Sequence, residues 1–153
     1  MIGKLVQVAS NTVTSPVASV TLTGIDSNDV YMVAFSNVSP ATAEQLKVRL
    51  TESGTANTTA NYDFAAEHFR TSGAYENPEG TDATSMTVCS AQIHASTGNG
   101  NGILYLYSAN NSSENSFLSS ETVAWAGSSQ VAGDIGVNAF TVTSAVDGVN
   151  FFI

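Results

Sequence analysis

Few side chains in this sequence could act as a nucleophile, a general base or a metal ligand. There is one cysteine, Cys89, and there are two histidines, His68 and His94, far apart along the chain. Nucleophilic catalysis needs a serine or cysteine beside an oriented base, and no Gly-x-Ser-x-Gly segment marks such a serine. One cysteine and two distant histidines also lack the ligand spacing of a zinc site. We therefore expect no catalytic residue, no metal and no cofactor.

The acidic residues suggest two further chemistries. A pair of carboxylates for glycoside hydrolysis could be drawn from Asp63, Glu67, Glu76 and Glu79, but the sequence does not give the distance between them. The Asp-Ser-Asn-Asp segment at residues 26–29 offers oxygen ligands for calcium. It lacks the spacing and the closing glutamate of an EF-hand, so we interpret it as a turn and leave cation binding open.

The composition excludes several classes of partner. The chain of 153 residues has 4 basic and 13 acidic residues, a formal net charge of −9. Four cations cannot follow a phosphate backbone, so we expect no nucleic-acid binding. There is no signal-peptide pattern and no run of the roughly 20 apolar residues that crosses a bilayer, so we expect cytoplasmic synthesis without membrane insertion. A single cysteine excludes an internal disulfide, and Cys89 is expected to be a small buried residue.

The elements are predicted to be strands. Only 11% of residues are charged, and Val, Thr, Tyr and Phe are frequent, as is typical of sheets. Alternating patterns and turn signals predict strands over residues 5–8, 18–24, 30–38, 46–51, 62–70, 85–95, 103–107, 135–142 and 146–153, and one ending at Trp125. Residues 52–60 and 72–84 are expected to be loops, and the segments 127–129 and 133–134 are expected to interrupt the chain. With about nine or ten strands and no substantial helix, we expect an all-β single-domain β-sandwich, of jelly-roll type, or a barrel. Residues 1–16 are expected to form an arm or attachment strand, and residues 17–153 the domain.

The stretch 96–125 carries the clearest local signal. The doubled Asn-Gly segment at residues 99–102 predicts a tight hairpin turn that leads into an apolar strand at 103–107. That strand and the one at 30–38 are apolar on both faces, so we expect the two to pair or pack together. Each should then lie between two sheets or face another subunit.

Several segments together resemble a β-sandwich module of marine tailed-phage virion proteins, of the cyanophage and pelagiphage type. They are VTLTGI at 20–25, DVYMVAFSNV at 29–38, LKVR at 46–49 with YDFA at 62–65, GILYLY at 102–107, NSF at 115–117 and SAVDGVNF at 144–151. The module occurs in fibres, tail appendages and capsid-surface proteins, often as trimers. It usually continues into a Gly-containing hairpin after this last segment, which this sequence lacks.

The resemblance implies a non-enzymatic virion component, assembled in the host cytoplasm. It would be a capsid decoration or a short fibre or tail appendage subunit, a homo-oligomer with a trimer favoured, in contact with other capsid or tail proteins. The alternatives are a glycan-binding module of the adsorption apparatus and, with less support, a hydrolase of host surface polymer. Candidate contacts for a partner or a host surface glycan are the cations of one strand, two aromatic residues and a loop: Lys47, Arg49, Tyr75, Trp125, Asn110 and Asn111.

Overall fold

The computed structural model describes residues 5–127 and 129–153, and in these residues the chain is all-β, as predicted. No helix in this part of the chain is long and apolar enough to span a membrane. The strands are β1 (Ser19–Thr23), β2 (Tyr31–Val38), β3 (Glu44–Glu52), β4 (Thr55–Ala56), β5 (Tyr62–Arg70), β6 (Tyr75–Glu76), β7 (Glu79–Ala83), β8 (Met86–Ile93), β9 (Gly100–Tyr107), β10 (Ser116–Ala126), β11 (Gln130–Phe140) and β12 (Gly148–Phe152).

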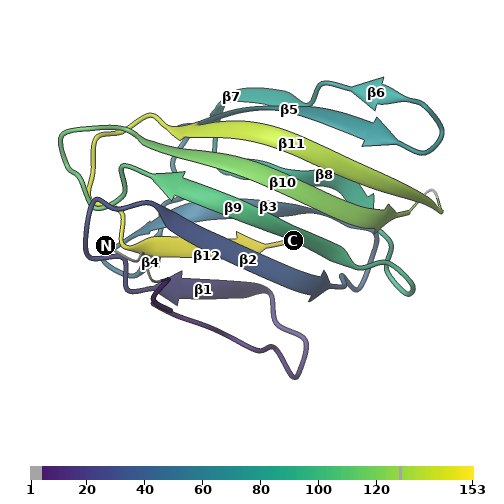
Figure 1. Ribbon diagram of the computed structural model, residues 1–153, viewed down its shortest axis with the longest axis horizontal. Coiled ribbons are helices and arrows are strands. Elements are labelled where there is room, and N and C mark those ends of the chain that lie inside the picture. The colour runs from purple at the N-terminus through teal and green to yellow at the C-terminus, as the bar shows by residue number, and fades with distance from the viewer. Residues whose placement is uncertain (1–4, 128) are drawn as a thin grey trace.

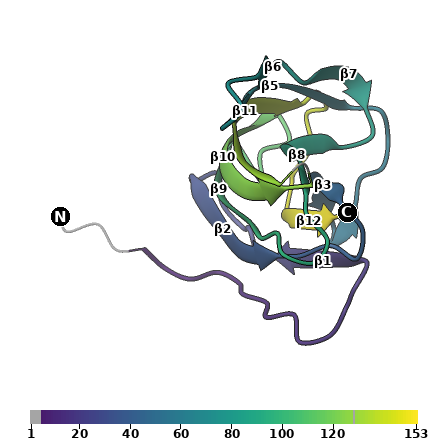
Figure 2. The same cartoon turned by 90° about the vertical axis from the view of Figure 1, so that its right-hand side faces the viewer.

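All the strands belong to one antiparallel sheet that folds over on itself. The order is β1-β12-β3-β8-β10-β11-β5-β6, and β9 followed by β2 branches from β10. The branch arises because β10 pairs with β9 over residues 117–124 but with β8 only at Ala126. As a result a front layer, β2-β9-β10-β11-β5, faces a back layer, β1-β12-β3-β8, across the core (Figures 1 and 2).

The core lies between these two layers. Tyr62 and Phe140 are fully buried, with ring centroids 5.0 Å apart. Phe35 of the front layer meets Phe151 of the back layer at 5.5 Å. Burying a large apolar side chain stabilises the fold by about 1.5–3 kcal/mol, so the inward positions of the alternating strands determine which side of each strand faces the core.

Several sequence predictions are confirmed. Segment 30–38 pairs with 103–107, with Tyr31 opposite Leu106. A strand covers residues 62–70, and Cys89 is buried. The strand count is twelve because β4, β6 and β7 form in segments that were expected to be loops.

The predicted Asn-Gly hairpin is wrong. Gly100 and Gly102 lie inside β9, and β9 pairs with β2 and β10, whereas β8 pairs with β3 and touches β10 at one position. The chain turns earlier, where Gly98 N donates to His94 O at 3.2 Å. Gly102 instead allows its neighbours to pack closely against the backbone of β9. A Cβ at this position would stand 2.7 Å from Glu121 O and 2.7 Å from Phe35 Cζ.

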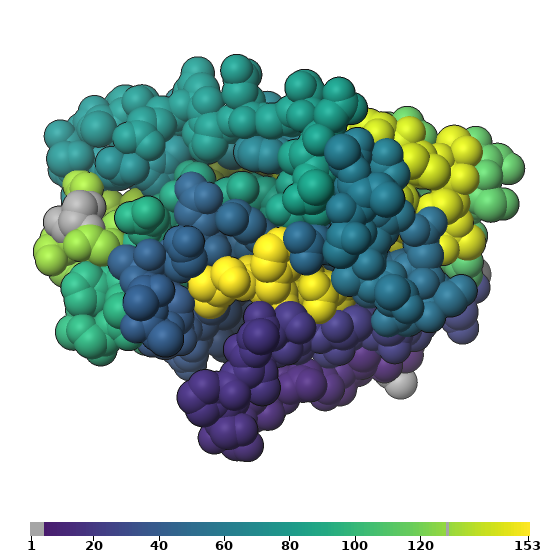
Figure 3. All heavy atoms as spheres, turned by 180° about the vertical axis from the view of Figure 1, so that it is seen from behind, coloured from purple at the N-terminus to yellow at the C-terminus, as the bar shows by residue number. Residues whose placement is uncertain are grey.

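Two further expectations need correction. Segment 5–8 forms no strand. Gly133 and Asp134, expected to interrupt the chain, lie within β11, because Gly133 leaves room for the Phe69 ring and Asp134 bonds in the core. The strand expected at residues 146–153 is confirmed as β12, which pairs with β1 and β3 and therefore lies inside the back layer (Figure 3).

Candidate functional site

The outer side of the front layer is an exposed apolar surface. Each of its strands alternates, and the inward residues are buried while the outward ones remain open, as in the pattern of β10. Ile135 and Val137 are 58% and 64% exposed. We define the apolar face by the large outward apolar residues of the front layer: Met32, Phe69, Ile103, Tyr105, Tyr107, Phe117, Val123, Trp125, Val131, Ile135 and Val137.

This surface bears on segment 103–107, which was expected to lie between two sheets or to face another subunit. One side of β9 is buried, with Leu104 and Leu106 inaccessible, but Ile103, Tyr105 and Tyr107 lie on the apolar face. No second layer formed by residues 5–127 and 129–153 covers them. A contiguous exposed apolar area of this kind is uncommon on a monomer and usually marks an interaction site.

Charge is sparse on the apolar face. Among the outward positions of the five strands, only Asp63, Glu67 and Glu121 are charged. Glu121 stands opposite Ile135 and Ile103 in the register, and Glu67 opposite Ile135. A strongly acidic chain thus keeps one broad surface with little charge.

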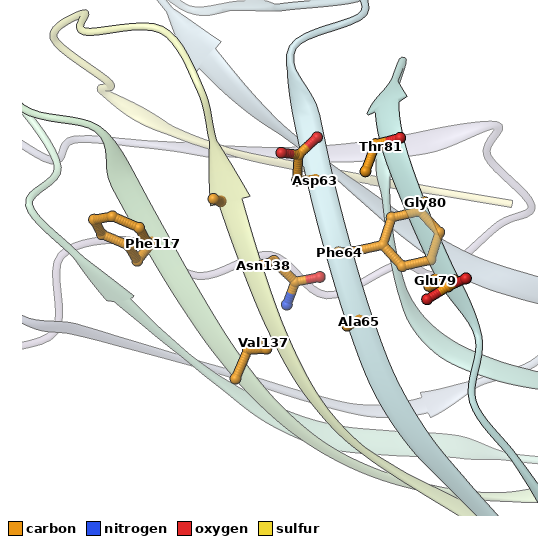
Figure 4. Close-up of a pocket in the computed structure, with 10 residues that line it drawn as sticks. Asp63, Phe64, Ala65, Glu79, Gly80, Thr81, Phe117, Val137 and Asn138 are labelled. Carbon is orange, nitrogen blue, oxygen red and sulfur yellow. The ribbon is translucent and has the colours of Figure 1, made fainter.

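At the β5 edge, the apolar face is hollowed. A shallow open hollow of about 680 Å³ is lined by ten residues (Figure 4): Asp63, Phe64, Ala65, Glu79, Gly80, Thr81, Phe117, Val137, Asn138 and Ala139. A second hollow of about 470 Å³ shares Ala65, Glu79 and Val137 with the first. Together they form one depression beside β7.

Local backbone geometry produces the hollow. β7 pairs with β5, with Gly80 opposite Phe64, and the register shifts between Tyr62 and Phe64. A Cβ on residue 80 would lie 2.4 Å from Phe64 Cε1, so the ring occupies space that only glycine leaves free. Asp82 N donates to Asp63 Oδ1 at 3.0 Å, which holds this carboxylate at the rim.

A buried polar network joins the two layers near the other end of β5. His68 and Asp134 are 0% and 2% exposed. His68 Nδ1 lies 2.9 Å from Asp134 Oδ1 and 3.0 Å from Ser90 Oγ. Arg70 Nε donates to His68 Nε2 at 2.7 Å. Serine, histidine and aspartate in contact resemble a catalytic triad, so the direction of each hydrogen bond decides their role.

The hydrogen bonds argue against nucleophile activation. Because Nε2 of His68 accepts from Arg70, the ring proton lies on Nδ1 and is donated to Asp134. Ser90 Oγ donates to Asp134 Oδ1, and Ser90 N donates to Oδ2 at 3.1 Å. His68 therefore has no free nitrogen to take a proton from Ser90. The network satisfies buried polar groups where β8 meets the front layer.

Cys89, next to this network, is also a poor nucleophile. Burial, followed by the nearby charge of Asp134, raises the pKa of its thiol from 9.0 to about 12. The reactive form of a cysteine is the thiolate, which is scarce when the pKa is this high. His94 lies at the end of β8, and its Nδ1 accepts from Ser96 N and Thr97 N at 3.2 and 3.3 Å, as expected of a locally bonded histidine.

The residues chosen from sequence as candidate contacts lie in three separate places. Tyr75 and Trp125 share one end of the outer side of the front layer, since Tyr75 stands opposite Phe69 and Trp125 opposite Val131. The other four are elsewhere.

Lys47 and Arg49 are on the outer side of the back layer. The Arg49 guanidinium lies 4.0 Å from the centroid of the Phe152 ring, and its Nε donates to Thr84 O at 2.9 Å. Asn110 and Asn111 lie in the β9–β10 loop, with Asn110 N bonded to Val146 O at 3.0 Å and Asn111 Oδ1 to Ser113 N at 3.0 Å.

The four acidic residues considered for glycoside hydrolysis do not lie together. Asp63, Glu67 and Glu79 line the two hollows, while Glu76 pairs with Arg70 at 2.9 Å. In the segment 26–29, Ser27 Oγ donates to Asp29 Oδ2 at 2.7 Å. Among residues 5–127 and 129–153, no three His, Cys, Asp or Glu side chains gather as metal ligands would.

The hollow and the buried network were both missed by sequence reasoning. Gly80 followed by Thr81 gave only a loop signal, and Asp134 after Gly133 gave a turn signal. Comparison with known proteins adds no family, because no protein-family model, no curated protein and no solved structure matches this chain. Function is therefore argued from the geometry and the sequence resemblance.

Proposed function

We propose that this protein is a non-enzymatic structural component of a tailed-phage virion, a capsid decoration or a short fibre or tail appendage subunit. The apolar face is the observation that carries the proposal, since a chain with net charge −9 leaves one broad surface with three charges. Such a surface suits contact with other protein subunits, and the sequence resemblance suggests that these belong to a virion.

The size of the apolar face is compatible with a stable interface. Five strands about 4.8 Å apart and roughly 30 Å long present an area of roughly 700 Å². Specific protein–protein interfaces bury about 800 Å² per partner. A homo-oligomer, with a trimer favoured, would cover this surface, and capsid or tail proteins are the other partners proposed.

Electron microscopy of purified virions tests the proposal. Antibodies raised against the protein should label intact particles of the phage that encodes it, at the capsid surface or on the tail. Particles that carry no label, while the same antibodies recognise the protein in infected cells, would contradict it.

A glycan-binding role is the second candidate, favoured by the position of Tyr75 and Trp125 on one exposed surface. Aromatic faces stack on sugar rings, so these two side chains could form a platform for a glycan. Binding to bacterial polysaccharides on a glycan array should then be lost in Trp125→Ala and retained in Arg49→Ala. Absence of binding across the array would count against this role.

A further inference from the structure

The segment before β1 is exposed to solvent along its whole length. We define the arm as residues 5–18, none of which belongs to a strand. Every one of these residues is exposed, including the apolar Leu5, Val6, Val8, Val13 and Val17. Leu5 and Val6 are 85% and 74% exposed. An extended segment with so many open aliphatic side chains gains stability when another surface covers them.

The arm is directed away from the domain. Val8 lies against Gly24: a Cβ on residue 24 would stand 3.0 Å from Val8 Cγ1. From this contact the chain runs outward on the side where β2, β9 and β10 lie (Figure 2). It therefore points to the side of the molecule that carries the apolar face.

The hollow beside β7 has apolar walls that could cover the exposed aliphatic side chains of the arm. Its walls include Phe64, Phe117 and Val137, and its volume of about 680 Å³ can seat aliphatic side chains. Two carboxylates, Asp63 and Glu79, lie at its rim. Lys4 precedes Leu5 and is the only charged residue among the first 25, whereas the rest of the chain has 3 cations against 13 acids. The arm and the hollow are complementary in apolarity, and the lysine that precedes the arm is opposite in charge to the rim of the hollow.

The positions of the two features are compatible with contact between copies. The arm leaves the domain at β1, the last strand of the back layer, while the hollow lies beside β7 at the other edge of the sheet (Figure 1). Thirteen residues, 5–17, span at most about 43–47 Å when fully extended. A neighbouring copy placed on the apolar face lies within that reach.

We propose that the N-terminal arm of one copy docks in the hollow of a second copy, with Leu5 and Val6 against Phe64 and Val137. The positive charge of Lys4, which precedes the arm in the sequence, is then attracted by Asp63 and Glu79. The proposal rests on the proposed function as an assembling subunit, and it names the partner as this same chain.

Disulfide trapping between two variants that each carry one added cysteine tests the contact. Val6→Cys and Thr81→Cys are prepared separately in the full chain and then mixed under mild oxidation. We expect mixed disulfide-linked dimers at a yield several-fold above that of Val6→Cys mixed with Thr87→Cys, whose new thiol lies on the back layer. Cys89 is buried and should contribute little background.

The charge of Lys4, the residue before the arm, gives a second measurement. Lys4→Glu, and separately Asp63→Asn with Glu79→Gln, should lower the yield of the Val6–Thr81 cross-link. Lys47→Glu makes the same charge change on the opposite surface and should leave it unaltered. A yield equal to the Thr87 control would overturn the proposal. So would a Val6→Cys/Thr81→Cys double variant that links only within single chains at every concentration.

These outcomes separate the inference from the function on which it rests. If virions are labelled but the cross-link stays at the control level, the protein is a virion subunit whose arm docks elsewhere. If the cross-link forms but virions carry no label, the arm exchange stands and the proposed function fails.

Discussion

His68 and Asp134 face each other across the paired strands β5 and β11, with Nδ1 of the imidazole 2.9 Å from Oδ1 of the carboxylate. Asp134 reaches beyond this pair, since Ser90 of the back layer donates to both of its oxygens. Thr122 Oγ1 donates to Oδ2 at 3.3 Å. One carboxylate thus accepts hydrogen bonds from three strands besides its own.

Asp134→Asn is expected to destabilise the fold by about 2–3 kcal/mol, because the new amide must face a group that itself donates a hydrogen bond. Both carboxylate oxygens accept bonds in the native protein, so neither orientation of the asparagine avoids this conflict. Urea unfolding measures the change. Asp26→Asn, at an exposed position, should leave the free energy of unfolding nearly unchanged. Equal stability of the two variants would show that the network is dispensable.

Ile135→Lys should abolish self-association while leaving the fold intact. Ile135 is 58% exposed, so the substitution is expected to change the free energy of unfolding by no more than about 0.5 kcal/mol. It places a cation opposite Glu67 and Glu121 in the middle of the apolar face, where a second subunit would have to bury all three charges. Sedimentation velocity should show smaller species than the wild-type protein. Thr87→Lys, on the back layer, is the matched control, and an unchanged assembly in Ile135→Lys would argue against this surface as the interface.

The free energy of unfolding should fall at alkaline pH, because a buried tyrosine hydroxyl and a buried cysteine thiol lose their protons there. Burial raises the pKa of Tyr62 from 10.0 to about 12, and that of Cys89 from 9.0 to about 12. Both groups are neutral when protonated, so the folded state holds their protons more tightly than the unfolded state. Their contribution is therefore complete below about pH 9 and is lost as the pH rises toward 12.

Urea unfolding across this pH range measures the effect. In Tyr62→Phe the decline with pH should be shallower, although its stability at pH 7 should also be lower, because Tyr62 OH accepts from Leu50 N and donates to Asn57 O. Tyr75→Phe, at an exposed residue, should retain the wild-type slope. A Tyr62→Phe slope equal to that of the wild type would contradict the assignment.

Gly102→Ala should cost about 1–3 kcal/mol, because a Cβ would overlap Glu121 O and the Phe35 ring and push β9 from its neighbours. Asn99→Ala should change the free energy of unfolding by less than about 0.5 kcal/mol, since Asn99 is exposed and outside β9. A tight hairpin at residues 99–102 would predict a clear cost for Asn99→Ala. Thermal or urea unfolding of the two variants therefore tests the role of these glycines directly.

Much of the strand pattern follows from local alternation. In β1, Val20 and Leu22 face inward while Ser19, Thr21 and Thr23 remain exposed, as their alternation predicts. The pairing of segments 30–38 and 103–107 was also predictable, because both segments carry apolar side chains on both faces of the strand. The short strands β4 and β6 were not predictable from the sequence. Each has two residues and forms only because it pairs with a longer strand, β3 for β4 and β5 for β6.

By itself, the sequence determined the all-β class, most strand positions and the absence of a nucleophile with a recognisable motif, because these depend on residue type and short-range alternation. Only the tertiary structure decided which face of β9 is buried. Ile103, Tyr105 and Tyr107 lie on one face and Leu104 and Leu106 on the other, so both faces are apolar and the sequence does not distinguish them. It also decided the burial of Asp134 and the hollow beside β7. These depend on contacts between residues far apart in the chain, which no local pattern specifies.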